Sequence, residues 1–291
     1  MNKKLVGAGL IIGAMMSVPA GAADIARPVY KAPVVAPPPA FTWTGFYIGG
    51  HVGGVRGRSS LDAVNDVVFP GFVTLGLPAI APIVAVPSRF ATVGGVSGSG
   101  TSFMGGGQLG YNWQVGSFLF GFEGDASWTR IRAGATQNVI DPFATATLTG
   151  TYTTEIDWTA SLRARLGVTF DRVLLYATGG AAFAGGRFNS AFTLVTPVPG
   201  IVFPVNNASG STAASASFTD LGWTVGGGLE WAFDNNWSIA GEYRYADYGR
   251  HSVTLATTDP SGQLGIIPIT TTRRLTTDQA TLRLNYRFGG T

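Results

Sequence analysis

From Trp43 onward, apolar and polar residues alternate with a period of two, which is typical of β-strands whose two faces meet different surroundings. The clearest run covers residues 156–170. Its apolar face holds Ile156, Trp158, Leu162, Leu166 and Phe170, and its polar face holds Asp157, Ser161, Arg163 and Arg165. Because about 9–11 residues suffice for a tilted strand to cross a bilayer, this run is long enough to span one.

Seven further segments show the same alternation, so eight strands are predicted. They are 46–55, 103–113, 118–128, 173–183, 221–233, 237–245 and 280–288. Glycine and alanine blur the faces of 46–55 and 173–183, so the sequence does not assign the facing of these two. The connections 115–117, 171–172 and 234–236 are short, whereas 58–101, 131–155, 187–217 and 250–276 are long. Outer-membrane barrels have short periplasmic turns and long external loops, so both chain ends are predicted to be periplasmic.

The polar face carries charges of both signs, and the apolar face carries aromatic residues near the strand ends. Trp113, Phe118, Phe170, Phe233, Trp237 and Phe288 are predicted at one end, and Trp128, Trp158 and Trp223 towards the other. Two aromatic girdles are typical of a bilayer-spanning barrel. A soluble sandwich or lipocalin-like barrel is the alternative. The pattern favours an all-β, eight-stranded antiparallel transmembrane β-barrel with long external loops.

Two apolar stretches in the predicted loops need separate interpretation. Residues 67–90 are strongly apolar, but four prolines within them exclude a spanning helix. Residues 253–272 consist of two β-rich arms around the turn signal Asp259-Pro260-Ser261-Gly262. Several barrel strands are therefore expected to continue beyond the membrane as hairpins.

Composition supports a barrel. Charged residues are 12% of the chain and glycine supplies 42 of 291 residues, against about 25% and about 7% in soluble domains. No apolar run reaches the roughly 20 unbroken residues of a spanning helix, which leaves a closed barrel as the only spanning structure. The absence of cysteine excludes disulfides and thiolate sites.

The N-terminal region predicts export. A basic start, a short apolar stretch over 5–18 and Ala20-Gly21-Ala22 together predict a signal peptide at 1–22. Residues 23–42 contain five prolines and predict an extended, poorly packed periplasmic lead, followed by the barrel at 43–291. Removing 1–22 lowers the net charge from +3 to +1, so no nucleic-acid partner is expected.

The inward-facing charges predict an ion-pair network in the lumen. Its members are Glu123, Asp125, Asp157, Arg163, Arg165, Glu230, Glu242, Arg244 and Arg283. The interior of an eight-stranded barrel is only wide enough to be filled by side chains, and unpaired charge there is costly. We therefore interpret the network as a structural plug, with a gated pore as the alternative.

Arginines also concentrate at the predicted outer rim. Lys31 is the only lysine after the predicted cleavage site, against sixteen arginines. Guanidinium groups bind phosphate in a bidentate fork better than an ammonium group does. Arg130, Arg132, Arg250, Arg273 and Arg274 are therefore the candidate contacts to lipopolysaccharide phosphate, and plain solvated loop charge is the alternative.

Three segments carry a family resemblance: Trp43 to Gly50 (WTGFYIGG), Leu174 to Gly180 (LLYATGG) and Leu282 to Phe288 (LRLNYRF). The chain resembles the alphaproteobacterial outer-membrane immunogenic proteins, which are small OmpA-like barrels of the porin family. This resemblance implies an outer-membrane location, surface exposure, and in some members haemin binding or weak pore activity. Leu282, Leu284, Tyr286 and Phe288 resemble the end-strand signal read by the barrel-assembly machinery, although Gly289-Gly290-Thr291 follow them.

Other chemistry is weakly represented. The glycine motif at residues 105–110 lies inside a predicted strand, so it is not a dinucleotide site. His251-Ser252 is the nearest approach to an acyl-transfer pair, but adjacent strand residues point to opposite faces; no enzyme activity and no cofactor is expected. Apolar loops with Tyr248 and His251 are the basis of a haemin-binding alternative. The sequence favours a structural barrel for envelope integrity that also interacts through its surface, with a small-solute porin or a haemin- or ligand-binding protein as alternatives.

Overall fold

The computed structural model describes residues 41–64, 67–73, 84–90, 95–140, 147–195, 210–258 and 266–288, and these are almost entirely β-strand. The predicted signal peptide and nearly all of the proline-rich lead lie outside these residues, as does the predicted turn at 259–262. Across the described ranges no helix is long and apolar enough to cross a membrane.

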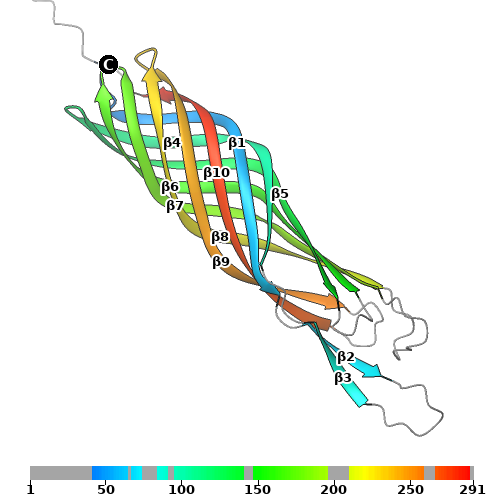
Figure 1. The fold of residues 1–291 in the computed structure, drawn as a ribbon. Coiled ribbons are helices and arrows are strands. Elements are labelled where there is room, and N and C mark those ends of the chain that lie inside the picture. The colour runs from blue at the N-terminus through cyan, green and yellow to red at the C-terminus, as the bar shows by residue number, and fades with distance from the viewer. Residues whose placement is uncertain are drawn as a thin grey trace, which may run out of the picture. The chain divides into compact units, whose positions relative to one another are not determined.

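Eight strands close into one antiparallel barrel (Figure 1). They are β1 (Gly45–Val64), β4 (Val96–Val115), β5 (Phe118–Ile140), β6 (Thr147–Phe170), β7 (Val173–Val195), β8 (Gly210–Ala232), β9 (Trp237–Thr258) and β10 (Ile266–Arg287). Neighbours in sequence are neighbours in the wall, and β1 closes the ring against β10. β2 (Val67–Val73) and β3 (Val84–Phe90) form a separate two-stranded sheet. The predicted fold class is confirmed.

The barrel strands are longer than the sequence pattern indicated. They contain 20 to 24 residues, whereas about 9–11 cross a bilayer. Strands therefore continue into much of the four predicted loops, 58–101, 131–155, 187–217 and 250–276. This agrees with the expectation that several barrel strands continue beyond the membrane as hairpins. The pattern fades there because strands that leave the bilayer carry serine and threonine on their outer face, so the contrast between faces is lost.

Short turns mark one end of the barrel, which we call the turn end; the opposite end is the loop end. Gly116 and Asp171 adopt positive φ values of 61° and 52° in the two tightest turns. Glycine tolerates this conformation freely, and aspartate tolerates it better than most residues. The predicted short connections are thus confirmed as turns between β4 and β5, β6 and β7, and β8 and β9.

The outward face is apolar over a band that matches a bilayer. On β5 the exposed aromatic residues run from Phe118 to Trp128. At about 3.3 Å per residue this is roughly 33 Å along the strand, or about 23 Å along the membrane normal at a tilt of about 45°. Outer-membrane barrels carry an apolar band about 25 Å tall.

Register shifts at β-bulges change the facing of β6 just beyond this band. The ladder between β5 and β6 shifts between Trp128 and Ile131, and that between β6 and β7 shifts between Ile156 and Trp158. An extra residue reverses the alternation, so Ile156 is fully buried inside the barrel. The prediction that Ile156 shares the outward face of Trp158 is therefore wrong.

Candidate functional site: the filled lumen and its charged outer belt

Glu123 on β5 is the centre of an ion-pair network inside the barrel. Its carboxylate accepts hydrogen bonds from the hydroxyl of Tyr47 at 2.6 Å, from Arg283 at 2.6 Å and from Arg163. These partners come from β1, β10 and β6, so a single carboxylate on β5 contacts side chains of three other strands of the wall. Alternation places every one of these side chains on the inward face of its strand.

Glu242 on β9 duplicates this arrangement. It accepts from Arg163 at 2.6 Å, from Tyr176 at 3.0 Å and from Arg283. Arg163 and Arg283 therefore each lie between the same two glutamates. The result is a closed square of two acids and two arginines, in which each charge has two partners of opposite sign.

Two further acids extend the network along the lumen. Asp125 accepts from Arg244 at 2.7 Å and lies 3.2 Å from Arg163. Glu230 pairs with Arg165 and accepts from Ser238 at 2.5 Å and Asn285 at 2.9 Å.

Eight of the nine predicted network residues meet in the lumen, where four carboxylates face four guanidinium groups. Each of the eight is buried. The exception is Asp157, which the β6 bulge turns to the outer surface, where it lies 3.6 Å from Arg187. Its assignment to the lumen is wrong for the same reason as that of Ile156.

The predicted network did not include the neutral side chains that complete it, although Gln108 and Asn285 fall on the inward face of the alternating pattern. Arg165 stacks on Tyr176, with its guanidinium carbon 3.7 Å from the ring centroid. The two ring nitrogens of His51 form hydrogen bonds with Gln108 at 2.6 Å and with Ser127 at 2.7 Å. The amide nitrogen of Gln108 donates to Asn285 at 2.8 Å. Tyr47, His51 and Tyr176 lie on the two strands whose faces glycine and alanine blurred, so the pattern contained no clear signal for them.

An apolar layer closes the lumen at the turn end. Trp43, Leu119, Leu174, Tyr176 and Ala232 pack together there, with Phe41 against them. Trp43 is 1% exposed, and its indole nitrogen donates to the carbonyl of Asp171 at 3.1 Å. Phe41, the second-last residue of the predicted lead, thus packs against this layer and lies beside Arg172 and Arg287. Its packing arises from tertiary contacts that no local pattern encodes.

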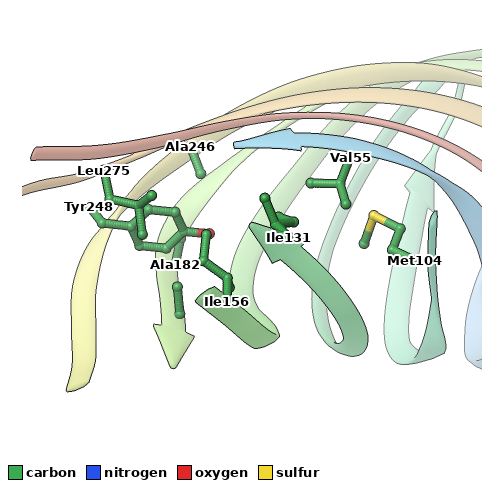
Figure 2. Packing of buried hydrophobic residues seen from close by; sticks show 9 residues of the cluster. Val55, Met104, Ile131, Ile156, Ala182, Ala246, Tyr248 and Leu275 are labelled. Carbon is green, nitrogen blue, oxygen red and sulfur yellow. The ribbon is translucent and has the colours of Figure 1, made fainter. Parts of the chain in front are cut away.

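A second apolar layer fills the lumen beyond the network, towards the loop end. Val55, Met104, Ile131, Ile156, Ala182, Ala184, Ala246, Tyr248 and Leu275 form this cluster, with Phe218 packed against it. Figure 2 shows its side chains arriving from strands all around the wall. Along β5 the inward residues run in order from Leu119 through Glu123 and Asp125 to Ile131, so the charged layer lies between the two apolar layers.

Arg273 belongs to the interior and not to the outer rim. Its side chain is fully buried, pairs with Asp220 and stacks on Phe218, with 3.7 Å from the guanidinium carbon to the ring centroid. It is therefore not available to lipopolysaccharide, and its prediction as a contact is wrong. Leu221 faces outward, so extending the alternation by one residue would have placed Asp220 in the lumen.

The remaining outer arginines form a belt just beyond the outer aromatic residues. Four arginine–carboxylate pairs lie on it: Arg58–Asp278 at 2.8 Å, Arg132–Glu155 at 3.0 Å, Arg187–Asp157 at 3.6 Å and Arg274–Asp247 at 2.6 Å. Arg56, Arg130 and Arg250 are also exposed at this level. We call these seven arginines of the described residues the arginine belt, and the four carboxylates named above lie among them.

The last strand presents its predicted signal residues on the outside of the wall. Leu282, Leu284 and Phe288 are exposed, and Tyr286 packs between Trp237 and Phe288 at centroid distances of 5.1 and 5.0 Å. Residues 289–291, which follow this motif, lie outside the described part of the chain.

The residues considered for haemin binding or catalysis are engaged in other contacts. A ring nitrogen of His251 lies 2.7 Å from the carbonyl oxygen of Tyr248, and Tyr248 itself is buried in the loop-end layer. The hydroxyl of Ser252 lies 3.2 Å from that of Thr272. Within the described ranges, no three side chains of the metal-binding types gather into a site.

Comparison with known proteins agrees with this architecture. A family model described as an outer membrane protein beta-barrel domain matches residues 10–288. The 31 kDa outer-membrane immunogenic protein of Brucella melitensis is 32% identical over 253 residues, covering 83% of this chain and 86% of that protein. The 22 kDa outer membrane protein of Rhizobium leguminosarum is 28% identical over 147 residues, covering 49% and 52%. Among solved structures, the outer membrane protease OmpT of Escherichia coli aligns with a TM-score of 0.39 at 9% identity, covering 86% of this chain and 99% of that one.

Proposed function

Because the chain belongs to the outer-membrane β-barrel protein family and lies in the outer membrane, we propose that it is a non-conducting barrel that reinforces the envelope. The observation that carries this proposal is the layered filling of its lumen. A charged layer of four acids and four arginines lies between two apolar layers. The turn end is periplasmic and the loop end external, as in other outer-membrane barrels.

Each layer opposes ion passage for a different reason. In the charged layer every carboxylate is already paired, so a passing ion would have to displace a guanidinium group from a buried carboxylate. The apolar layers consist mainly of hydrocarbon side chains, which cannot replace the hydration shell of an ion, and desolvating a charge without compensation is costly. Opening a continuous path would require all three layers to rearrange together.

In planar lipid bilayers the refolded protein is expected to show no discrete conductance steps at neutral pH. A matched preparation of a known porin, added at the same protein concentration, supplies the positive control. Reproducible unitary steps from the protein itself would contradict the sealed lumen and would favour the alternative of a small-solute porin.

The arginine belt supports a second part of the proposal, namely that the barrel binds lipopolysaccharide at the outer leaflet. Of the predicted contacts, Arg130, Arg132, Arg250 and Arg274 are exposed at the level of the lipid headgroups. With Arg250 left aside, the belt has six arginines against four acids among the described residues, and this positive surplus suits the phosphate groups of that leaflet. Such contacts would link the barrel to its lipid neighbours and so contribute to envelope integrity.

Replacing Arg130, Arg132, Arg250 and Arg274 together by glutamine is expected to weaken lipopolysaccharide binding at least tenfold, since each charge-assisted contact contributes about 1.5–3 kcal/mol. Binding can be measured by titration of the detergent-solubilised protein. Arg172→Gln, at the turn end, is the control and should leave affinity unchanged. If the fourfold variant keeps full affinity, these arginines are solvated surface charges that do not bind lipopolysaccharide.

The loop end is proposed to be the surface-exposed, interacting part of the molecule. The Brucella relative is named an immunogenic protein, which supports external exposure of the corresponding region here. The outward residues Leu282, Leu284, Tyr286 and Phe288 on β10 are proposed to be read by the barrel-assembly machinery. No enzymatic role is proposed, and the names of the relatives, an outer-membrane immunogenic protein and an outer membrane protein, mention no catalytic activity.

A further inference from the structure

A groove interrupts the apolar outer surface where β9, β10, β1 and β4 lie side by side. Its volume is about 740 Å³. Small outward residues, Gly54, Gly241 and Ala280, form its floor, and the exposed side chains of Phe103 and Leu282 stand at its walls. Adjacent strands place Gly54 opposite Ala280 and Gly241 opposite Leu282, so the small residues lie together on the surface.

The groove is open space rather than a packed junction. A Cβ atom added at Gly54 or at Gly241 would meet no other atom within 4 Å. Phe103 is 89% exposed, the largest exposed fraction among the large apolar side chains that the structure describes. In a bilayer such a groove is filled by lipid chains, because an empty one would forfeit dispersion contacts along all its walls.

The loop end of the groove is charged. The hydroxyl of Tyr243, which lines the groove, donates to Asp278 at 2.7 Å, and Asp278 pairs with Arg58 at 2.8 Å. Arg56 lies directly opposite Asp278 in the ladder and is exposed on the same side. Two guanidinium groups against one carboxylate leave a net positive charge at this point.

The height of this charged end matches the headgroup region. Arg56 is ten residues from the outward aromatic Phe46 at the turn end of β1. At about 3.3 Å per residue and a tilt of about 45°, these side chains are about 23 Å apart along the membrane normal. The groove therefore runs from the hydrocarbon region to the outer headgroups, with its positive end at the level of lipid phosphates.

We propose that this groove is a specific site for one lipopolysaccharide molecule, with a lipid A acyl chain along Gly54 and Gly241 and a lipid A phosphate at Arg56 and Arg58. This inference deepens the proposed binding of lipopolysaccharide and rests on the same membrane orientation. It adds a single saturable site. The site uses Arg56 and Arg58, which the fourfold arginine variant of the preceding subsection does not replace. Lipopolysaccharide is favoured over phospholipid because the positive end faces the outer leaflet.

A second groove on the outer surface provides the matched control. It has a volume of about 510 Å³ and is lined by Gly107, Leu109, Ala126 and Leu162 among others. The one charged residue in its lining, Asp125, is bound within the lumen network. It therefore offers an acyl chain similar apolar walls without an exposed charge for a phosphate.

Native mass spectrometry of the refolded protein, titrated with purified lipid A, tests the proposal. Wild-type protein is expected to retain one tightly bound lipid A. Gly241→Leu should weaken this binding about tenfold or more because the new side chain occupies the space of the acyl chain. The double variant Arg56→Gln/Arg58→Gln should weaken it to a similar extent because it removes the charge-assisted contacts to the phosphate. Gly107→Leu should leave it unchanged, because a Cβ there has its nearest neighbour at 3.6 Å.

Three results would overturn the site. Unchanged lipid A retention by both the groove-filling and the arginine variants would show that the lipid binds elsewhere. Equal retention of phosphatidylglycerol would show that no lipopolysaccharide selectivity exists. A dimer mass that disappears with Gly241→Leu would assign the groove to a second copy of the chain. None of these results would affect the closed lumen, which the conductance measurement tests separately.

Discussion

Glu123→Gln is expected to lower the free energy of unfolding by about 3–5 kcal/mol, the usual cost of removing one partner from a buried ion pair. The substitution keeps the size of the side chain but removes the charge that Arg163 and Arg283 share. Glu242 would then be the only remaining carboxylate that contacts both guanidinium groups. Urea unfolding in lipid vesicles, followed by tryptophan fluorescence, measures the change.

The control for this prediction is an ion pair on the outer surface. Asp278→Asn removes the partner of Arg58, whose side chain is 49% exposed. Exposed pairs contribute about 1 kcal/mol or less, so this variant should unfold close to the wild type. If Glu123→Gln were no more damaging than Asp278→Asn, the lumen network would not hold the wall together.

Gly106→Ala is expected to destabilise the barrel by about 3 kcal/mol or more and to reduce the refolded fraction, because the wall has no room for the methyl group. A Cβ atom at Gly106 would lie 2.0 Å from the carbonyl oxygen of Ala126 and 2.7 Å from the Cα atom of Ser127. Both are backbone atoms of the paired strand, so no side-chain rotation relieves the contact. The heat-modifiable mobility shift in gel electrophoresis measures the refolded fraction, and the midpoint of urea unfolding measures the loss of stability.

The adjacent glycine gives a control that differs by one position. At Gly107 the nearest atom to an added Cβ is 3.6 Å away, which is ordinary van der Waals contact. Gly107→Ala is therefore expected to be neutral, or stabilising by up to about 1 kcal/mol through the reduced freedom of the unfolded chain. Equal damage at both positions would mean that glycine is needed there for flexibility and not for close approach.

The layers of the lumen explain how so narrow a barrel accommodates the eight buried charges of the network. Each guanidinium and carboxylate group contacts an oppositely charged partner, and tyrosine, serine and asparagine side chains satisfy further lone pairs. Leaving either sign in excess would be costly in a low dielectric. The apolar layers on both sides keep water from competing for these contacts, so the same groups that seal the lumen also connect strands far apart in sequence.

Local alternation in the sequence was sufficient to determine much of this structure. A period of two identifies the strands and assigns the faces of all but 46–55 and 173–183, so eight of the nine proposed lumen residues could be read directly from the pattern. The short connections at 115–117, 171–172 and 234–236 indicated where the chain reverses. These features depend on neighbouring residues only, because successive side chains of a strand point to opposite sides whatever the strand contacts.

Features that depend on contacts across the barrel were decided only by the tertiary structure. The bulge at Asp157 reversed the facing of one strand, Arg273 turned inward to Asp220, and Trp43 closed the turn end from outside the strand pattern. The partners of each charge, the two apolar layers and the outer groove likewise require strands to be placed side by side. The sequence determines which side of the wall most residues face, whereas ring closure and register determine which residues meet there.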